Sequence, residues 1–218
     1  MKNKLVIALA LLVLFSTYKP QRLFLSSKFN IKEIKIENNL ILKDAEIKAK
    51  LNFIYDKNLI FFKTDKIEKI FQNSTFIESF EIKKIYPNKL RIKIFEKKPI
   101  AILQNKKEKF YISEKIDLIN YINLENYRDL PIVFGNKDSF KELYENLKKI
   151  DFPIDLIKKY YLYESKRWDL ETYEKKIIKL PNRNYNKSLK NFINLRKSNN
   201  FDKYNVFDYR INNQLILK

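Results

Sequence analysis

Residues 79–103 read SFEIKKIYPNKLRIKIFEKKPIAIL, and this stretch decides the fold of the first half of the chain. Apolar and charged residues alternate on both sides of Tyr-Pro-Asn-Lys at 86–89, which is the period-two pattern of half-buried strands. Proline and asparagine favour turns, so an antiparallel hairpin is predicted. Pro99 ends the second strand because proline cannot donate to a ladder, and another apolar run follows at 100–103.

One strand and two helices are predicted before this hairpin. Residues 31–36 carry the apolar positions of a strand. Asp44 is placed to cap a first helix, and Asp65 with Glu68 three residues later resembles the capping box of a second. The predicted order is therefore β-α-α-β-β within about 75 residues, the size of one small domain.

Composition excludes several kinds of catalytic site. The 218 residues include no cysteine and no histidine, so thiol nucleophiles, imidazole bases, disulfides and the usual zinc ligands are excluded. Gly135 is the only glycine, which excludes a glycine-rich phosphate-binding loop. Carboxylates remain, but helix caps and solvated strand faces explain them. Hydrolysis and group transfer are not excluded by composition, but no prepared catalytic constellation is visible. We expect a protein that is not an enzyme and that has no cofactor, no metal site and no small-molecule substrate.

The net charge of +19 raises the question of nucleic-acid binding, because clustered lysine and arginine bind phosphate. Here the basic residues are mostly lysines, spread along the whole chain, whereas arginine is the better bidentate phosphate ligand. A lysine-rich solvated surface is the favoured interpretation, and no nucleic-acid partner is expected. A secreted basic nucleic-acid binder stays as an alternative.

The N-terminus carries a single long apolar segment. Two lysines precede an uninterrupted apolar run at 5–15. A membrane-spanning helix needs about 20 residues, and a shorter run also suits a signal peptide. Residues 16–20 offer no clear cleavage site, so we predict a retained signal anchor over 5–25 after a short stub at 1–4. The basic residues on both sides of the apolar run do not settle which end is cytoplasmic. Whether the segment is cleaved stays open.

The second half, from residue 100 to 218, alternates short apolar runs with polar turns. Ser139 with Glu142 predicts the start of one helix, and a second helix is predicted over 187–197. Trp168 lies in an alternating strand and is interpreted as a core residue rather than a partner anchor. Strands are predicted at 100–103, 110–112, 116–121, 161–164, 167–170, 177–181, 206–210 and 214–217.

Several segments resemble the FtsQ/DivIB family of bacterial cell-division proteins. The β-α-α-β-β order ending in YPNKLRIKIFEKKPIAIL resembles the POTRA domain of that family, over 29–99. Further on, LPIVFG at 130–135, RWDL at 167–170 and FDYR at 207–210 follow in the family's order. The resemblance implies an α+β protein: an N-terminal transmembrane helix, the POTRA domain, then over 100–218 an FtsQ-type mixed β domain of mainly antiparallel strands with two helices.

Two turns depart from the family pattern. Asn38-Asn39 stands where the family usually has Gly-Asn, and Glu174-Lys175 replaces a turn that carries glycine. Asparagine and lysine must then adopt the backbone conformations that glycine adopts most easily.

The resemblance also implies a role and a location. The chain would be a single-pass inner-membrane protein with a cytoplasmic N-terminus and a periplasmic bulk, enriched at the division septum. It would be a scaffold of the divisome that binds the FtsB/FtsL coiled coil and other division proteins. A POTRA-type periplasmic chaperone or assembly factor for envelope proteins is the alternative, although RWDL and FDYR count against it.

The last strand is the predicted partner site. A final strand at a chain terminus is an edge that can accept a strand from another protein, and the resemblance implies that Arg210 pairs with an acidic residue of FtsB. The alternative is an ordinary edge, with Arg210 paired internally to Asp208. The predicted site residues are Arg210, Ile211, Asn213, Gln214, Leu215, Ile216 and Leu217, and a possible second interface in the POTRA domain has Phe80, Ile82 and Lys83.

Overall fold

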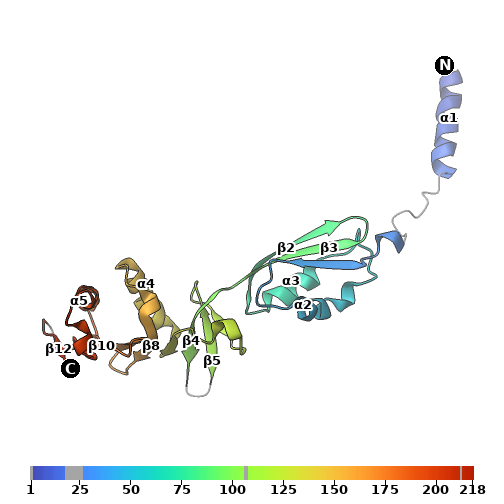
Figure 1. The fold of residues 1–218 in the computed structure, drawn as a ribbon. Helices are drawn as coiled ribbons and strands as arrows, with labels where there is room; N and C mark the ends of the chain where they lie inside the picture. Colours follow the sequence, from blue (N-terminus) through green and yellow to red (C-terminus); the bar gives the residue numbers. More distant parts are fainter. Residues whose placement is uncertain (1, 18–26, 106–107, 212) are drawn as a thin grey trace. The chain divides into compact units, whose positions relative to one another are not determined.

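The computed structural model describes residues 2–17, 27–105, 108–211 and 213–218 (Figure 1). The chain divides into two compact units, Met1–Glu96 and Lys97–Lys218. Each unit encloses its own cluster of buried apolar side chains. The architecture is α+β, as predicted.

The N-terminal helix α1 spans Lys2–Thr17 and has 16 residues. Its described side chains, from residue 4 to 16, are exposed and almost all apolar. Over the ranges given above, no helix combines the length and the apolar character needed to cross a membrane. The part of the predicted 5–25 anchor from residue 18 onward lies outside the described residues.

After α1, unit 1 is a three-stranded sheet with two α-helices. The order along the chain is β1 (Glu33–Glu37), α2 (Asp44–Lys50), α3 (Asp65–Gln72), β2 (Ile77–Ile85) and β3 (Lys89–Glu96). Strand β3 is central, parallel to β1 and antiparallel to β2. This is the predicted β-α-α-β-β order, and α2 and α3 lie on one side of the sheet (Figure 1).

The alternating pattern of the hairpin explains the core of unit 1. Leu90, Ile92 and Ile94 are each fully buried and form one cluster with Ile47 of α2 and Ile67 of α3. Because successive strand residues point to opposite faces, the charged residues between them lie on the other face.

The start of each helix in unit 1 differs from the capping that we expected. Asp44 and Asp65 are the first helical residues, and the N-cap positions are Lys43 and Thr64. The two acidic residues therefore lie in the first helical turn, where a negative charge interacts favourably with the positive end of the helix dipole. The Thr64 hydroxyl donates to the Glu68 carboxylate at 2.5 Å. The Tyr86–Pro87 peptide bond in the hairpin turn is cis.

Unit 2 is a mixed sheet of nine strands with the order β12-β11-β10-β9-β8-β7-β4-β5-β6. Adjacent strands are antiparallel except for the parallel pairs β4–β7, β7–β8 and β10–β11. The elements are β4 (Pro99–Gln104), β5 (Lys109–Ser113), β6 (Leu118–Asn120), β7 (Ile132–Phe134), α4 (Lys137–Lys149), β8 (Ile157–Leu162), β9 (Trp168–Thr172), β10 (Ile177–Lys179), α5 (Asn186–Arg196), β11 (Val206–Asp208) and β12 (Ile216–Leu217).

Both helices of unit 2 cover the same face of its sheet. Phe140 of α4 contacts Tyr160 of β8, with ring centroids 5.2 Å apart, and Phe192 of α5 contacts Phe207 of β11 at 5.0 Å. Tyr160 and Phe207 lie in one row across the strands, through the register of β8, β9, β10 and β11. Trp168 is buried in this core, as predicted.

Several predicted boundaries in unit 2 shift. Helix α4 begins earlier than predicted, because Asn136 is the N-cap and its side chain accepts a hydrogen bond from the Ser139 N–H at 2.9 Å. The last two strands are shorter than predicted, since β11 ends at Asp208 and β12 begins at Ile216. Short 3-10 helices occur at Ser27–Phe29, Asn52–Ile54, Glu125–Tyr127, Ile154–Leu156 and Phe201–Lys203.

The chain has a single glycine, and two turns where glycine would be favoured are formed without it. Asn38 and Lys175 adopt φ values of 66° and 62°, so the turns without glycine keep a left-handed conformation. Gly135 is required for space instead: a Cβ atom there would lie 2.9 Å from the Leu162 Cβ and 3.2 Å from a ring carbon of Trp168.

Candidate partner-binding site

Strand β12 forms one edge of the unit 2 sheet. It pairs antiparallel with β11, with Ile216 opposite Asp208 and Leu217 opposite Phe207. Lys218 extends the pairing, because its N–H donates to the Val206 carbonyl at 3.1 Å and its carbonyl accepts from the Val206 N–H at 2.9 Å. The other side of β12 faces no strand of the described chain.

The hydrogen-bonding pattern determines which backbone groups of β12 point outward. In an antiparallel pair, residues alternate between those that bond to the partner strand and those that point away from it. Since Lys218 bonds to Val206, Ile216 is the next residue that faces β11. The N–H and C=O groups of Leu217, and of Leu215 before it, are therefore directed to the open side.

The predicted site residues differ in whether their side chains are exposed to solvent. Ile216 is 38% exposed, and Ile211 is also exposed. Leu215 and Leu217 pack against the core of unit 2, so the edge offers their backbone rather than their side chains. Asn213 has a φ of 59°, which suits the predicted turn. Gln214 is exposed, and Asn212 lies outside the described residues.

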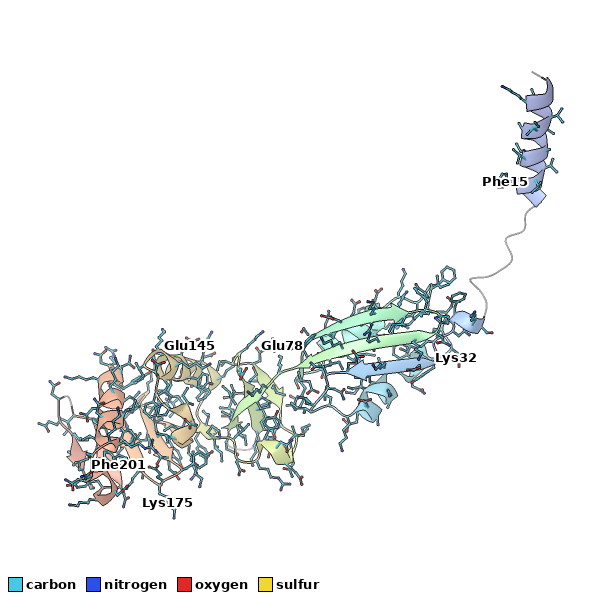
Figure 2. The ribbon with its side chains drawn as sticks, turned by 45° about the horizontal axis from the view of Figure 1, so that its top comes forward. Phe15, Lys32, Glu78, Glu145, Lys175 and Phe201 are labelled. Atoms are coloured by element: carbon cyan, nitrogen blue, oxygen red, sulfur yellow. The ribbon has the colours of Figure 1, made fainter. Side chains whose placement is uncertain are left out.

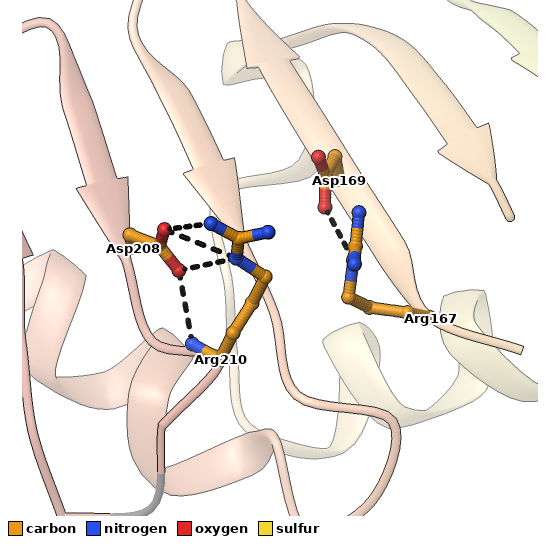
Figure 3. Close-up of polar contacts among 4 residues, drawn as sticks. All are labelled: Arg167, Asp169, Asp208 and Arg210. Carbon is orange, nitrogen blue, oxygen red and sulfur yellow. Dashed lines mark hydrogen bonds and ion pairs between the residues drawn. The ribbon is translucent and has the colours of Figure 1, made fainter. Parts of the chain in front are cut away.

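Arg210 is paired with Asp208 directly after β11. Its guanidinium donates to both carboxylate oxygens, with Nη2 to Oδ2 at 2.6 Å and Nε to Oδ1 at 2.8 Å (Figure 3). The Arg210 backbone N–H also donates to Oδ1 at 3.1 Å. These bonds hold the pKa of Asp208 below its ordinary value and raise that of Arg210. The internal pairing that we kept as an alternative is thus present, while the Arg210 side chain stays partly exposed.

A second pair of the same kind lies two strands away. Arg167 donates through Nε to the Asp169 carboxylate at 3.2 Å (Figure 3). Its guanidinium also lies over the Tyr163 ring, 4.4 Å from the centroid. Asp169 and Asp208 are both buried, and each pairs with an arginine two residues away in sequence, Arg167 before Asp169 and Arg210 after Asp208.

The two aspartates belong to one cross-strand row on the face of the sheet that the helices leave uncovered. The register aligns Asp169 with Lys179 and Lys179 with Asp208, and Ile216 completes the row at the edge. We did not predict a role for Arg167, Asp169 or Lys179. The i, i+2 spacing of arginine and aspartate in RWDL and FDYR was the available signal, because such residues share one face of a strand.

A hollow borders the turn that leads into β12. It is lined by Ile211, Asn213, Gln214 and Leu215 from the turn, by Arg183 from the segment before α5 and by Lys187 from the first turn of α5. Tyr209 also lines it, and its hydroxyl donates to Asn191 of α5 at 2.9 Å. Burial raises the pKa of Tyr209, so this hydroxyl stays protonated. The basic residues Arg183 and Lys187 were not among the predicted site residues.

The predicted second interface lies on another sheet edge. Strand β2 is the outer strand of the unit 1 sheet, next to β3. Phe80 and Ile82 pack against the core of unit 1, while Lys83 is exposed. Within the described segments, no group of three or more acidic side chains could hold a metal ion.

Two family models match the chain, one in each unit. A family model described as "POTRA domain, FtsQ-type" matches residues 29–97, and one described as "Cell division protein FtsQ/DivIB, C-terminal" matches residues 101–210. No curated protein matches the chain. Among solved structures, the chain is similar to the major extracytoplasmic domain of the trans isomer of the cell division protein DivIB from Geobacillus stearothermophilus. Sequence identity is 15% over 44% of this chain and 87% of that chain, with a TM-score of 0.31.

The fold of unit 1 and its family match define a POTRA-bearing protein. The second match covers half of the chain and lies in unit 2, where it includes RWDL and FDYR. The chain belongs to the FtsQ/DivIB family of cell-division proteins.

Proposed function

We propose that this chain is a single-pass membrane scaffold of the bacterial divisome that captures a partner division protein by strand addition at β12. The observation that carries the proposal is the open edge of β12, where the backbone groups of Leu215 and Leu217 point away from β11. Unpaired backbone groups at a sheet edge are a template for a strand of another chain. This work is non-enzymatic.

The proposed partner is a protein of the FtsB and FtsL kind that presents an extended acidic segment. Arg210 lies directly before the β11–β12 turn, and Arg183 and Lys187 line the hollow beside it. Basic side chains around an edge favour an acidic strand, because complementary charge speeds association and selects the partner. In this proposal Arg210 keeps Asp208 and gains an acidic partner residue on its exposed side.

The proposal places α1 in the inner membrane, with the N-terminus in the cytoplasm and both units in the periplasm. A 16-residue helix is about 24 Å long, against about 30 Å for the hydrocarbon core of a bilayer. The sequence adds further apolar residues at 23–25, which supports an anchor longer than α1.

The test of strand addition separates the contribution of the outward-pointing backbone N–H from the contribution of the side chain. Leu217→Pro removes the outward donor and also the leucine packing, whereas Leu217→Ala removes only the packing. Leu215→Pro and Leu215→Ala form a second matched pair. We expect both proline variants to lose capture of the partner, and both alanine variants to retain most of it.

Capture is measured with the purified full-length chain and the division proteins that co-purify with it from growing cells, and Trp168 fluorescence reports whether unit 2 is folded. If folded proline variants capture the partner as well as the alanine variants do, strand addition at β12 is wrong. Enrichment of a full-length C-terminal fusion at midcell before constriction would support the divisome role, while a uniform envelope signal would contradict it.

A further inference from the structure

One end of unit 1 exposes aromatic side chains among lysines. Phe53 is 40% exposed and Phe61 is 64% exposed, and both line one shallow hollow. Lys57, Lys63 and Lys66 line the same hollow, with Asp65 as its single acidic residue. We call Phe53, Lys57, Phe61, Lys63 and Lys66 the aromatic-lysine tip.

The tip is held in place by contacts on both sides of Phe61. The Lys84 ammonium on β2 donates to the carbonyls of Ile60 at 3.2 Å and Phe62 at 2.6 Å. Ile54 and Leu59 are fully buried in the core of unit 1, next to the exposed phenylalanines. The exposure of Phe61 is therefore a feature of the folded loop.

The tip lies where the chain enters unit 1 from α1. The Ile31 N–H donates to the Lys57 carbonyl at 2.9 Å, and the Leu59 N–H donates to the Phe29 carbonyl at 2.8 Å. Lys32 is at the same end of the unit, beside the first 3-10 helix (Figure 2). Ten peptide steps separate Thr17 from Ser27, and a chain of that length spans at most about 35 Å.

The turn between β2 and β3 brings a third aromatic residue to this end. The Lys32 N–H donates to the Asn88 carbonyl at 2.9 Å, which fixes the turn next to the entering chain. Tyr86 in this turn is 56% exposed. Exposed aromatic rings and lysines therefore lie together at the end of unit 1 that is tethered to α1.

We infer that the aromatic-lysine tip docks on the surface of the membrane that holds α1. This inference rests on the proposed membrane anchor. Phenylalanine side chains enter the boundary between headgroups and acyl chains, and lysines are attracted to anionic headgroup phosphates. The short connection to α1 keeps the tip within reach of that surface. Docking holds one end of unit 1 at the bilayer and restricts the rotation of the unit about its tether.

The absence of cysteine allows a direct test in the full-length chain. Phe61→Cys and Leu40→Cys are each labelled with an environment-sensitive fluorophore, and the chain is inserted into nanodiscs of phosphatidylcholine and phosphatidylglycerol with nitroxide-bearing lipids. Leu40 is the matched control, because it is 91% exposed and its N–H bonds to Glu96 at the other end of the sheet. A label at Asn52, through Asn52→Cys, keeps all five tip residues.

We expect the lipid nitroxides to quench the labels at positions 61 and 52 but not the label at 40. Quenching at position 52 should fall with Phe61→Ser, with the combined Lys57→Gln, Lys63→Gln and Lys66→Gln substitutions, or when phosphatidylglycerol is omitted. Discs that carry the chain without quenching at 61 and 52 overturn docking and leave the anchor intact. Failure of the chain to co-purify with the discs overturns the anchor, and docking with it.

Discussion

The Arg210 guanidinium and the Asp208 carboxylate lie two residues apart on the chain and share three hydrogen bonds, the shortest from Nη2 to Oδ2 at 2.6 Å. The carboxylate is buried, whereas the arginine is partly exposed at the end of β11, near the open edge of β12. Arg210 thus holds the end of β11, and in the proposed complex it would also meet a partner. Substitutions of Arg210 have to be designed with both the observed and the proposed role in mind.

Substitutions of Arg210 should weaken partner capture least for Arg210→Lys, more for Arg210→Gln and most for Arg210→Glu. Arg210→Lys keeps the positive charge but loses the bidentate geometry. Arg210→Gln removes the charge, and Arg210→Glu adds a carboxylate beside Asp208. The affinity for the partner is measured at low and high salt, because the charge contribution is screened by salt. Equal affinities of the parent chain and Arg210→Gln at low salt would remove Arg210 from the binding site.

The stability of unit 2 should depend on pH through Asp208. Hydrogen bonds from Arg210 lower the folded-state pKa of Asp208 below the ordinary value, which is about 3.9. Its contribution to stability is therefore present above about pH 4 and is lost as the pH falls through the folded-state pKa. The difference in urea midpoint between the parent chain and Asp208→Asn should be constant near neutral pH and shrink below about pH 4.

Fluorescence of Trp168, the single tryptophan, reports this unfolding from within the core of unit 2. A midpoint difference that stays the same down to about pH 3 would show that Asp208 is not the group responsible.

Gly135→Ala should destabilise unit 2 by about 1–3 kcal/mol, because overpacking forces neighbouring atoms to shift. The new methyl group would lie 2.9 Å from the Leu162 Cβ, which is fixed to the backbone of β8 and cannot swing away. The measurement is the urea midpoint from Trp168 fluorescence. An unchanged midpoint would mean that β7 and β8 separate easily at this point.

Glu96→Gln should open the turn after β1. The carboxylate of Glu96 accepts hydrogen bonds from the N–H groups of Leu40, Ile41 and Leu42 at 2.9, 2.7 and 2.7 Å. An amide has only one oxygen, so a donor loses its acceptor, at a cost of about 1–2 kcal/mol. Amide hydrogen exchange at residues 40–42 should become faster. Glu81→Gln, at an exposed position of β2, is the control, and equal exchange in both variants would contradict the prediction.

Local signals in the sequence predicted much of the fold. The alternation in 79–103 predicted the hairpin and the burial of Ile92 and Ile94, because a strand has a side-chain period of two. The predicted helix over 187–197 appears as Asn186–Arg196, since its apolar positions follow a helical period. The sequence also located two turns where glycine would be favoured, and Asn38 and Lys175 adopt the left-handed conformation there.

The tertiary structure decided how the candidate site is divided between backbone and side chains. Sequence placed Leu215, Ile216 and Leu217 together at an edge, but only the pairing with β11 assigns outward backbone groups to the leucines and an exposed side chain to Ile216. The choice between a free Arg210 and one bonded to Asp208 likewise depended on where β11 ends.

By itself, the sequence determined that cysteine and histidine chemistry and a glycine-rich phosphate loop are absent. It also predicted which segments form strands and helices, because the periodicity of apolar residues is a local property. Only the tertiary structure aligned Asp169, Lys179 and Asp208 across three strands, and only it gathered Phe53 and Phe61 with lysines beside the entering chain. These arrangements join residues distant in sequence, and they depend on strand register and loop packing, which no single segment contains.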